Sequence, residues 1–339
     1  MLNQFKISVT LFLMLASLMS QELRNTPDIV TKVATCAGNW LKLETGTRAI
    51  GMGGAHVATG DGIYAVPYNP ASIGFIEGSE TFFSRTNYVA GITHNVLGYA
   101  KQLTPSDFAG VHIFYMDSGD MLVTDKEHPN GYGEYFSVTG FSLRGIYTKI
   151  LTDRLKVGGA IKYIRENIYT AHMQSFVFDI GSNFDTGIYG MILGMSVSNF
   201  GPEVQFDGEG LEVVVSDDID PDEKLKRVTG EFPLPLTFRL GIRNDIIGPD
   251  SQFMDIPGSR LSVALDGINA IDYTVYGSLG FEYAWQEMAF LRGGTHLGHD
   301  TAGISLGGGV KYQGINIDYA YVNYGVLEST HQFGIGLEF

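Results

Sequence analysis

The amino-acid sequence predicts an all-β protein, a transmembrane antiparallel β-barrel of about 14 strands with an N-terminal periplasmic or lumenal plug. Three observations lead to this fold class. The first 20 residues have the pattern of an export signal, side chains alternate with a period of two from residue 80 onward, and short loops alternate with longer ones. We therefore expect an integral protein of the bacterial outer membrane, in contact with outer-membrane lipid.

The composition agrees with tightly turned strands and argues against nucleic acid as a partner. Glycine accounts for 44 of the 339 residues, tyrosine for 18 and phenylalanine for 21, whereas charged residues make up only 17%. Glycine averages roughly 7% in globular chains. The formal net charge of −15 would repel a phosphate backbone. We expect no nucleic-acid partner.

The N-terminal residues resemble a signal peptide. Lys6 precedes an apolar run at residues 7–19, which is too short to span a membrane, and small residues follow near Ser20. We expect a signal peptide at 1–20, an N-terminal segment and plug at 21–79, and an outer-membrane β-barrel at 80–339. The chain has a single cysteine, Cys36, so no disulfide bond forms within it.

Period-two alternation places the strands. We expect them to begin near residues 81, 92, 108, 136, 154, 172, 187, 235, 260, 273, 288, 301, 315 and 330. The even number suits a closed antiparallel barrel. The pattern changes face near Gly140, which indicates a bulge or a curved strand. The last strand alternates most clearly, and we expect it to serve in barrel assembly; its apolar face carries Phe333, Ile335, Leu337 and Phe339.

Loop lengths support a barrel with one external end and one periplasmic end. Outer-membrane barrels have short periplasmic turns and longer external loops. Every second connection is short, and only the one around "IGPDSQFMDIPG" is longer than expected. The two longest connections, at 117–135 and 201–235, both fall on the external side.

Charged residues within the strands are expected to face the lumen, because a charge facing lipid costs roughly 2–4 kcal/mol at the bilayer midplane. We expect a paired network, in which Arg239 or Arg243 pairs with Asp266, Glu282 with Arg292, and Lys311 with Asp318. The full set is Arg239, Arg243, Asp266, Glu282, Arg292, Lys311, Asp318 and Glu338. Trp285, Tyr312 and Tyr324 lie near strand ends, where aromatic girdles form.

The glycine- and proline-rich stretch at 49–74 precedes the first strand, so we place it on the periplasmic side. Glycine permits positive φ and close backbone approach, and each proline favours extended geometry before it. Irregular backbone is tolerated at membrane depth where protein encloses it. The stretch therefore predicts a plug inside the barrel, with these candidate residues: Gly51, Gly53, Gly54, Asp61, Asn69, Pro70 and Ala71.

The same stretch resembles a known family. "LKLETGTRAIGMGGAHVATGDGIYAVPYNPASIGF" (41–75) is similar to the N-terminal signature of the PorV/PorQ family of outer-membrane proteins, and "FPLPLTFRLGI", "LSVALDG", "GFEYAW" and "AFLRGGT" look like its later blocks. This family is similar in turn to the fatty-acid transporter FadL, whose barrel holds a hatch with an Asn-Pro-Ala motif. Asn69, Pro70 and Ala71 match that motif, whereas Tyr68 and Ser72 depart from the usual Trp and Gly.

The resemblance implies a non-enzymatic component of type IX (Por) protein secretion, which binds protein partners or cargo through its external loops. The alternative is a FadL-like transporter of long-chain fatty acids or other hydrophobic small molecules, with such a molecule as its ligand. A lipid carrier needs a continuous apolar pocket. Because the expected lumenal network is polar and paired, the sequence favours the secretion role.

No catalytic, cofactor or metal site is expected. "GISLG" (303–307) matches a serine nucleophile motif, but the alternation continues through it without the strand–turn–helix elbow that the motif requires. His296 and His299 lack a third metal ligand nearby in the sequence. The acidic run at 217–223 lacks the spacing of a calcium loop and is better explained as a solvated loop.

Overall fold

The structure is a computed structural model that describes residues 33–214, 224–226 and 228–339. The predicted signal peptide at 1–20 lies outside the described residues, as does the acidic run at 217–223. No helix within the described residues is long and apolar enough to cross a membrane.

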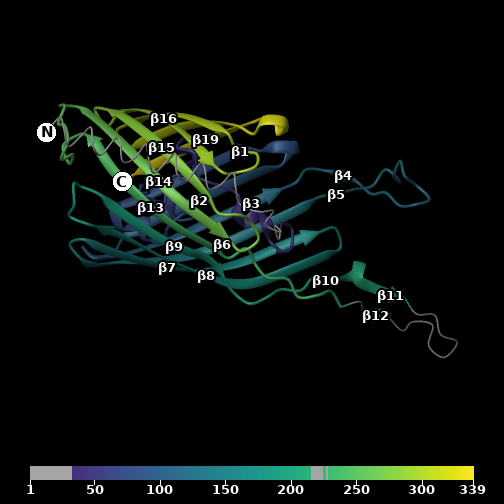
Figure 1. The fold of residues 1–339 in the computed structure, drawn as a ribbon. Coiled ribbons are helices and arrows are strands. Elements are labelled where there is room, and N and C mark those ends of the chain that lie inside the picture. Colours follow the sequence, from purple (N-terminus) through teal and green to yellow (C-terminus); the bar gives the residue numbers. More distant parts are fainter. Residues whose placement is uncertain (1–32, 215–223, 227) are drawn as a thin grey trace.

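In the part of the chain that the structure describes, fourteen antiparallel strands form a closed barrel, which confirms the predicted fold class (Figure 1). Pairing of β1 with β19 closes the sheet. Every barrel strand begins within five residues of its predicted start. The strands are β1 (Ser79–Asn87), β2 (Thr93–Gln102), β3 (Asp107–Asp117), β6 (Val138–Thr152), β7 (Leu155–Ile168), β8 (Ala171–Asp185), β9 (Ile192–Phe200), β13 (Thr237–Ile247), β14 (Ser259–Ala270), β15 (Tyr276–Trp285), β16 (Ala289–Leu297), β17 (Ile304–Tyr312), β18 (Ile315–Asn323) and β19 (Ser329–Glu338).

The outward face of the barrel is apolar, as a membrane requires. In β19, Phe333, Ile335 and Leu337 are exposed, whereas the residues between them are buried on the lumenal side. Other strands expose leucine, isoleucine, valine, phenylalanine and tyrosine in the same way. Together with the closed antiparallel sheet, this apolar band makes the chain an integral outer-membrane barrel.

Two of the three aromatic residues expected in girdles are exposed at strand ends, and the third is not. Trp285 and Tyr312 are exposed at the ends of β15 and β17. Tyr324 instead packs edge-on against Tyr88, with 5.5 Å between ring centroids. These two residues come from adjacent external turns, and they line the mouth of the lumen.

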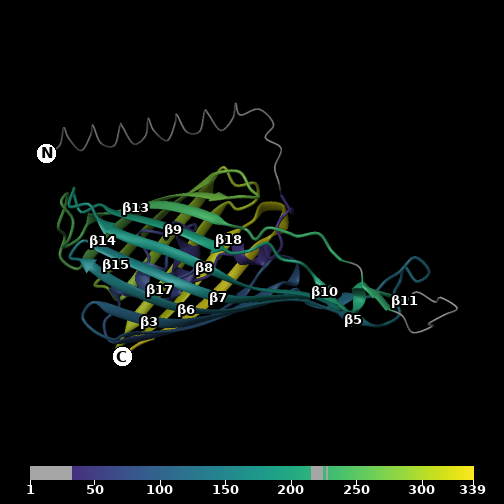
Figure 2. The same cartoon turned by 90° about the horizontal axis from the view of Figure 1, so that it is seen from below.

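Two external connections project well beyond the barrel, at the end opposite the C-terminus (Figures 1 and 2). The first contains β4 (Met121–Leu122) and β5 (Tyr135–Phe136), and the second contains β10 (Asp207–Gly208), η5 (Glu209–Leu211), β11 (Glu212–Val214) and β12 (Lys224–Lys226). They are called the external arms below. Two further external turns contain the short 3-10 helices η4 (Val89–Gly91) and η6 (Gly325–Leu327).

Residues 33–78 lie inside the barrel and are called the inner segment below (Figure 2). The segment contains η1 (Asn39–Lys42), α2 (Thr47–Gly51), η2 (Ile63–Ala65) and η3 (Pro70–Phe75). The helix α2 contacts β16, β17, β18 and β19, whereas η3 contacts β6, β7 and β8. The segment therefore touches both sides of the wall.

The inner segment traverses the lumen, so it reaches farther than the predicted plug at 49–74, which the sequence placed inside the barrel on the periplasmic side. At the external mouth, the backbone nitrogen of Ala37 donates to Pro233 O (3.0 Å). At the other end, the backbone nitrogen of Ser79 donates to Phe339 O (2.7 Å) beside the short turns. Residues 36–46, which lie across the external mouth, are called the external strap below.

Lumenal glycines in the wall make room for the inner segment. A Cβ atom at Gly158 would lie 2.5 Å from Pro70 C, and one at Gly280 would lie 2.5 Å from Met52 O. Neither backbone neighbour can move away as the tip of a side chain would, so close approach requires glycine. Other lumenal glycines that face the inner segment are Gly98, Gly140, Gly181, Gly194, Gly241, Gly294, Gly307 and Gly334.

Gly140 belongs to this set, and no bulge occurs there. The pairing of β6 with β3 and β7 continues without a shift through Gly140. Its Cβ position lies 2.7 Å from the Trp40 ring, which explains why a small residue interrupts the expected pattern. The irregularity in β6 lies between Ile150 and Thr152.

The adjacent residues Gly293 and Gly294 provide a matched test of the close packing between the inner segment and the wall glycines. Gly294→Val would drive a side chain into the backbone at Met52 and Gly53, and we expect it to destabilise the barrel by more than the roughly 1–3 kcal/mol typical of overpacking. Gly293→Val is the control, because the nearest atom to its Cβ lies 4.0 Å away on the opposite face. Urea unfolding of the vesicle-inserted proteins measures both. Equal stability of the two variants would contradict a close fit of segment to wall.

Candidate functional site

A buried ion cluster joins the inner segment to one half of the wall. Arg48 of α2 makes two hydrogen bonds to Glu282 of β15, from Nε to Oε2 (2.6 Å) and from Nη2 to Oε1 (2.7 Å). Glu282 also accepts from Arg292 Nε (2.7 Å) and Arg260 Nη2 (3.0 Å). The Glu282 side chain is fully buried. Such a carboxylate needs these partners, because an unpaired buried charge is strongly unfavourable.

The wall residues of the predicted network all have polar contacts, but several of their partners differ from those expected. Arg292 contacts Asp318 through Nη1 and Oδ1 (2.5 Å) as well as Glu282, so Asp318 does not pair with Lys311. Lys311 pairs instead with Glu338, with 2.6 Å between Nζ and Oε2. These contacts lie towards the periplasmic end, where β17, β18 and β19 end or begin.

The other three residues of the predicted charge network are Asp266, Arg243 and Arg239, and they do not pair with one another. Asp266 accepts hydrogen bonds from the backbone nitrogens of His56 (2.6 Å) and Val57 (2.8 Å), and no ion pair joins it to an arginine among the described residues. Arg243 pairs with Asp245 on its own strand (2.9 Å). Arg239 lies near Ser198 Oγ, at 3.4 Å, and 5.9 Å from the centre of the Tyr68 ring.

The Asn-Pro-Ala motif of the inner segment is held on the opposite half of the wall. Asn69 Oδ1 accepts from the nitrogen of Ala71 (3.0 Å) and so caps η3, while Asn69 Nδ2 donates to Ser182 O (3.0 Å) in β8. Pro70 O accepts from Thr148 Oγ1 (2.7 Å) in β6. The motif therefore positions the segment against the wall.

The remaining candidate residues of the inner segment have local structural roles. Asp61 contacts Arg48 and accepts from the Tyr64 hydroxyl (2.8 Å). Gly53 and Gly54 both have positive φ, at 63° and 75°, which L side chains rarely adopt. Gly51 lies against Gly307 of β17.

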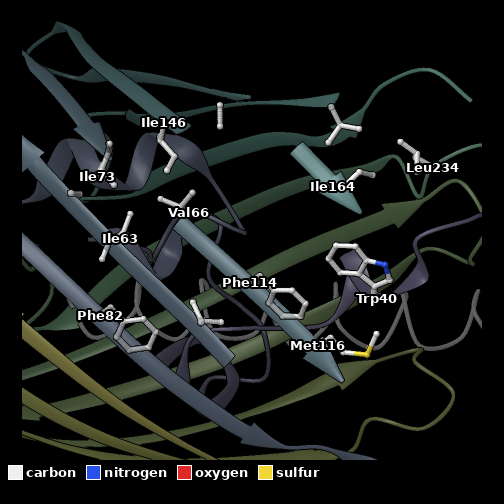
Figure 3. Packing of buried hydrophobic residues seen from close by; sticks show 14 of the residues in the cluster. Trp40, Ile63, Val66, Ile73, Phe82, Phe114, Met116, Ile146, Ile164 and Leu234 are labelled. Atoms are coloured by element: carbon white, nitrogen blue, oxygen red, sulfur yellow. The ribbon is translucent and has the colours of Figure 1, made fainter. Parts of the chain in front are cut away.

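An apolar cluster fills the lumenal half formed by β2, β3, β6, β7 and β8 (Figure 3). Trp40 stacks on Phe114, with 5.6 Å between ring centroids and 8° between planes. Further buried members come from both the wall and the inner segment: Ile63, Val66, Ile73, Phe82, Met116, Ile146, Ile164, Met173 and Leu234. The expected polar, paired network therefore does not extend over this half of the lumen, which is largely apolar.

Two larger cavities lie at opposite ends of the inner segment. The periplasmic cavity has a volume of about 300 Å3 and is lined mainly by charged residues, including Arg48, Glu80 and Lys311. The external cavity, called the external vestibule below, has a volume of about 230 Å3. The aromatic side chains that line the vestibule are Tyr88, Tyr273, Tyr276, His296, His299 and Tyr324.

Polar contacts hold the strap and the outer loops around the vestibule. Lys42 of the strap pairs with Asp272 (2.5 Å between Nζ and Oδ2), and Glu44 Oε1 lies 3.0 Å from His296 Nε2. The Tyr273 hydroxyl donates to Asp300 Oδ2 (2.6 Å). The vestibule is thus lined by aromatic rings together with the charged side chains of Lys42, Glu44 and Arg239.

Two loop residues of the vestibule are uncharged near neutral pH. Partial burial, followed by the hydrogen bond to Asp300, raises the pKa of Tyr273 to about 12. Burial, followed by the neighbouring His296, lowers the pKa of His299 below its ordinary value. Neutral rings at these positions suit an uncharged aromatic or aliphatic molecule better than an ion.

The motifs that resembled enzyme or metal sites have structural roles. Ser305 of "GISLG" is buried within the β17–β18 pairing and is not itself at a strand-to-helix turn. His296 and His299 pack ring against ring with 5.5 Å between centroids. Among the described residues, no group of three or more His, Cys, Asp or Glu side chains is placed to hold a metal ion.

Sequence reasoning missed the residues that fasten the inner segment and the aromatic vestibule. Arg48 had one available signal, because it is the sole lysine or arginine between positions 43 and 84. The tyrosines of the vestibule had none beyond the neighbouring pair Tyr273 and Tyr276, because Tyr88 and Tyr324 belong to two other external turns. Only the closed barrel brings them together.

Comparison with solved structures shows the FadL-like barrel fold. The CymD monoaromatic hydrocarbon channel matches with a TM-score of 0.56 at 12% identity, over 87% of this chain and 97% of that one. The Pseudomonas putida toluene transporter TodX matches with a TM-score of 0.52 at 13% identity, over 86% and 96%. A Pseudomonas aeruginosa FadL homologue matches with a TM-score of 0.52 at 13% identity, over 88% and 99%.

No protein-family model matches the chain, and no curated protein matches it either. The structural likeness therefore supports the broader expectation of a FadL-like barrel. The narrower resemblance to the PorV/PorQ family stays a prediction.

Arg48 provides a test of the ion cluster. Arg48→Met removes a buried cation from two carboxylates, Glu282 and Asp61, and we expect it to lower the free energy of unfolding by about 3 kcal/mol. Lys311→Met is the control, since both partners of its ion pair are more than a third exposed and such pairs contribute roughly 0–1 kcal/mol. Urea titration in lipid vesicles measures both. A loss no larger for Arg48→Met than for the control would show that the cluster does not fasten the segment.

Proposed function

We propose that the barrel admits small hydrophobic molecules to the outer membrane, as a FadL-like transporter plugged by its own inner segment. The observation that carries this proposal is the external vestibule, which faces the outside and ends at the inner segment. Its volume of about 230 Å3 is slightly below the roughly 300–1,000 Å3 of ordinary small-molecule pockets. A single aromatic ring or a short chain is the kind of molecule that fits.

The apolar cluster supports the same proposal. A hydrophobic molecule that moves inwards from the vestibule needs apolar surface along its path, because polar groups that it covers without a hydrogen bond are unfavourable. The cluster offers such surface along the inner segment, beginning at Trp40 of the external strap and including Ile63 and Ile73 deeper in the lumen. The charged residues that first favoured a secretion role are concentrated on the other half of the wall. Solved barrels of this fold include a toluene transporter and a hydrocarbon channel.

The vestibule can be blocked by one substitution. Ala302 lines it and is 8% exposed, so Ala302→Trp would occupy the space of a ring. We expect uptake of radiolabelled toluene by cells that carry this variant to fall at least about tenfold, as for a filled binding pocket. Leu297→Trp is the control, because Leu297 is 43% exposed on the lipid-facing side. Uptake by the wild type no greater than by cells without the barrel would overturn the proposal.

A second candidate function is the one that the PorV/PorQ resemblance implies, binding of secretion partners or cargo. The external arms favour it, because they extend beyond the barrel (Figure 1) and expose apolar side chains. Tyr132 and Tyr135 of the first arm are 50% and 64% exposed, and Val228 of the second is 80% exposed. Exposed aromatic residues are common in protein interfaces.

Removal of the first arm separates the two candidates. The backbone nitrogen of Val123 donates to Glu134 O (2.9 Å), so residues 124–133 can be replaced by an Asn-Gly turn without disturbing the barrel. If the arm binds a secretion partner, cross-linking of that partner in native membranes disappears while toluene uptake stays unchanged. Unchanged cross-linking with reduced uptake would instead assign the arm to transport.

A further inference from the structure

The periplasmic cavity is bordered by more negative than positive side chains. Six carboxylates and four basic groups line its volume of about 300 Å3. Each basic group already contacts a carboxylate, and three of them contact the buried Glu282, which adds a seventh negative charge next to the cavity. The nearby cation Lys156 lies over the Phe75 ring, 3.5 Å from its centroid, and its single charge still leaves the balance negative.

Glu80 of β1 is the buried carboxylate of this cavity that has no cation beside it. It is 5% exposed, and no ion pair joins it to any of the described residues. Its Oε2 atom accepts one hydrogen bond, from the backbone nitrogen of Ile63 (3.0 Å). Glu77 also lacks a cation, but it is exposed to water. Burial of a carboxylate without a compensating charge is unfavourable, so Glu80 needs a further partner.

A second carboxylate lies opposite Glu80. The strands β1 and β19 pair so that Glu80 is directly opposite Glu338, and both residues line the cavity. Like charges in directly opposite positions destabilise an antiparallel pair of strands. Lys311 Nζ contacts Glu338 Oε2 (2.6 Å), and within the described part of the chain no lysine or arginine makes such a contact with Glu80. One lysine therefore serves two carboxylates.

Asn316 of β18 is another residue of the cavity with an unsatisfied atom. Its Nδ2 atom donates to Glu338 Oε1 (2.9 Å), and its Oδ1 atom is buried without a hydrogen-bond partner among the described residues. The carboxylate of Glu338 fixes the orientation of this amide, because a charged carboxylate can only accept. No buried N–H or O–H group of the described side chains that line this cavity lacks a partner. The cavity therefore suits a ligand that donates hydrogen bonds.

The size and the aromatic lining of the cavity favour an organic cation over a metal ion. The rings of Tyr64 and Phe82 both line it, with 5.5 Å between their centroids. Aromatic rings attract ammonium groups and pack against methylene groups. The volume of about 300 Å3 is at the lower end of ordinary small-molecule pockets. Among the described residues, no group of three or more His, Cys, Asp or Glu side chains is placed to hold a metal ion.

We propose that the periplasmic cavity binds an aliphatic diamine or a longer polyamine, with one ammonium group between Glu80 and Glu338. An ammonium group has three N–H donors and no acceptor. It can therefore donate to both carboxylates and to Asn316 Oδ1, and its charge offsets the repulsion between the two glutamates. The methylene chain would lie against Phe82 and Tyr64, and the second ammonium group would offset the remaining negative charge. The proposal concerns the periplasmic end alone and stands whether or not molecules pass through the barrel.

The experiment is a thermal titration of the purified full-length protein in detergent, with 1,4-diaminobutane dihydrochloride replacing sodium chloride at constant ionic strength and constant pH. Tryptophan fluorescence gives the midpoint of unfolding. We expect a saturable rise of about 5 °C once the diamine exceeds its dissociation constant about a hundredfold. An equal midpoint in the two salts would overturn the proposal, because Glu80 would then be neutralised by a proton and would need no ligand.

Glu80→Gln keeps the shape of the side chain and removes its charge, so we expect the diamine-dependent rise to disappear. Glu338→Gln removes the opposite carboxylate and serves if the first variant does not fold. Glu166→Gln is the matched control, because Glu166 also accepts one hydrogen bond from the backbone of the inner segment, from Gly38 N (3.1 Å), but does so at the external end. Its variant should keep the full rise. A rise that persists in Glu80→Gln, or that Glu166→Gln loses as well, would overturn the proposal.

The class of cation is resolved by two further salts at the same ionic strength. Magnesium chloride should give no saturable rise, because no metal site is built from the described residues. Butylammonium chloride carries one ammonium group and should reach half of its effect only at a concentration at least about tenfold higher than the diamine. If magnesium matches the diamine, an inorganic cation is sufficient and the proposal is wrong. If butylammonium acts at the same concentration as the diamine, a single ammonium group is sufficient and the assignment to diamines is wrong.

Discussion

The structure depends on the close fit between a folded inner segment and glycines of the wall, which have no side chain at the points of closest approach. Backbone atoms of residues such as Met52, Val57 and Pro70 occupy the space where a Cβ atom of the wall would otherwise lie. Irregular backbone at membrane depth must satisfy its polar groups within the protein. Because the segment lies close to the wall, wall side chains can accept hydrogen bonds from its backbone. Asp266, for example, accepts from two backbone N–H groups of the segment. The high glycine content therefore reflects the lumen as much as the turns.

The barrel could be predicted from the sequence because lipid and lumen impose opposite demands on alternate residues. In β19, the large apolar residues Phe333 and Ile335 alternate with Gln332 and Gly334. This alternation predicts both that the segment is a strand and which of its faces meets the lipid. The contrast is weaker in β7, where Ile161 faces lipid while Ala160 and Ile164 face the lumen on either side of the buried Lys162. Apolar residues on both faces of a strand reduce the alternation, so the sequence did not predict the apolar cluster.

The candidate site was less predictable because its contacts depend on where the inner segment lies. Charge pairing predicted from neighbouring strands was right for Glu282 and Arg292, which face each other in register. It was wrong for Asp266, whose partner is the backbone of the segment some 210 residues away in sequence. No pattern in the sequence of β14 indicates that Asp266 binds the backbone of the inner segment. The vestibule is a similar case, since its rings come from separate turns and only the barrel closure joins them.

The two ends of the inner segment are fastened unequally, and this bears on how a molecule could enter. Around α2 the segment is held by a buried ion pair and around η3 by backbone packed against the wall, so displacement there would separate the buried Arg48 from Glu282 at a cost of several kcal/mol. The external strap is fastened by fewer contacts, such as Ala37 to Pro233 and Lys42 to Asp272, and part of it is exposed to water. Local opening occurs where fewest buried contacts are broken. Entry by movement of the strap therefore requires much less free energy than expulsion of the whole segment.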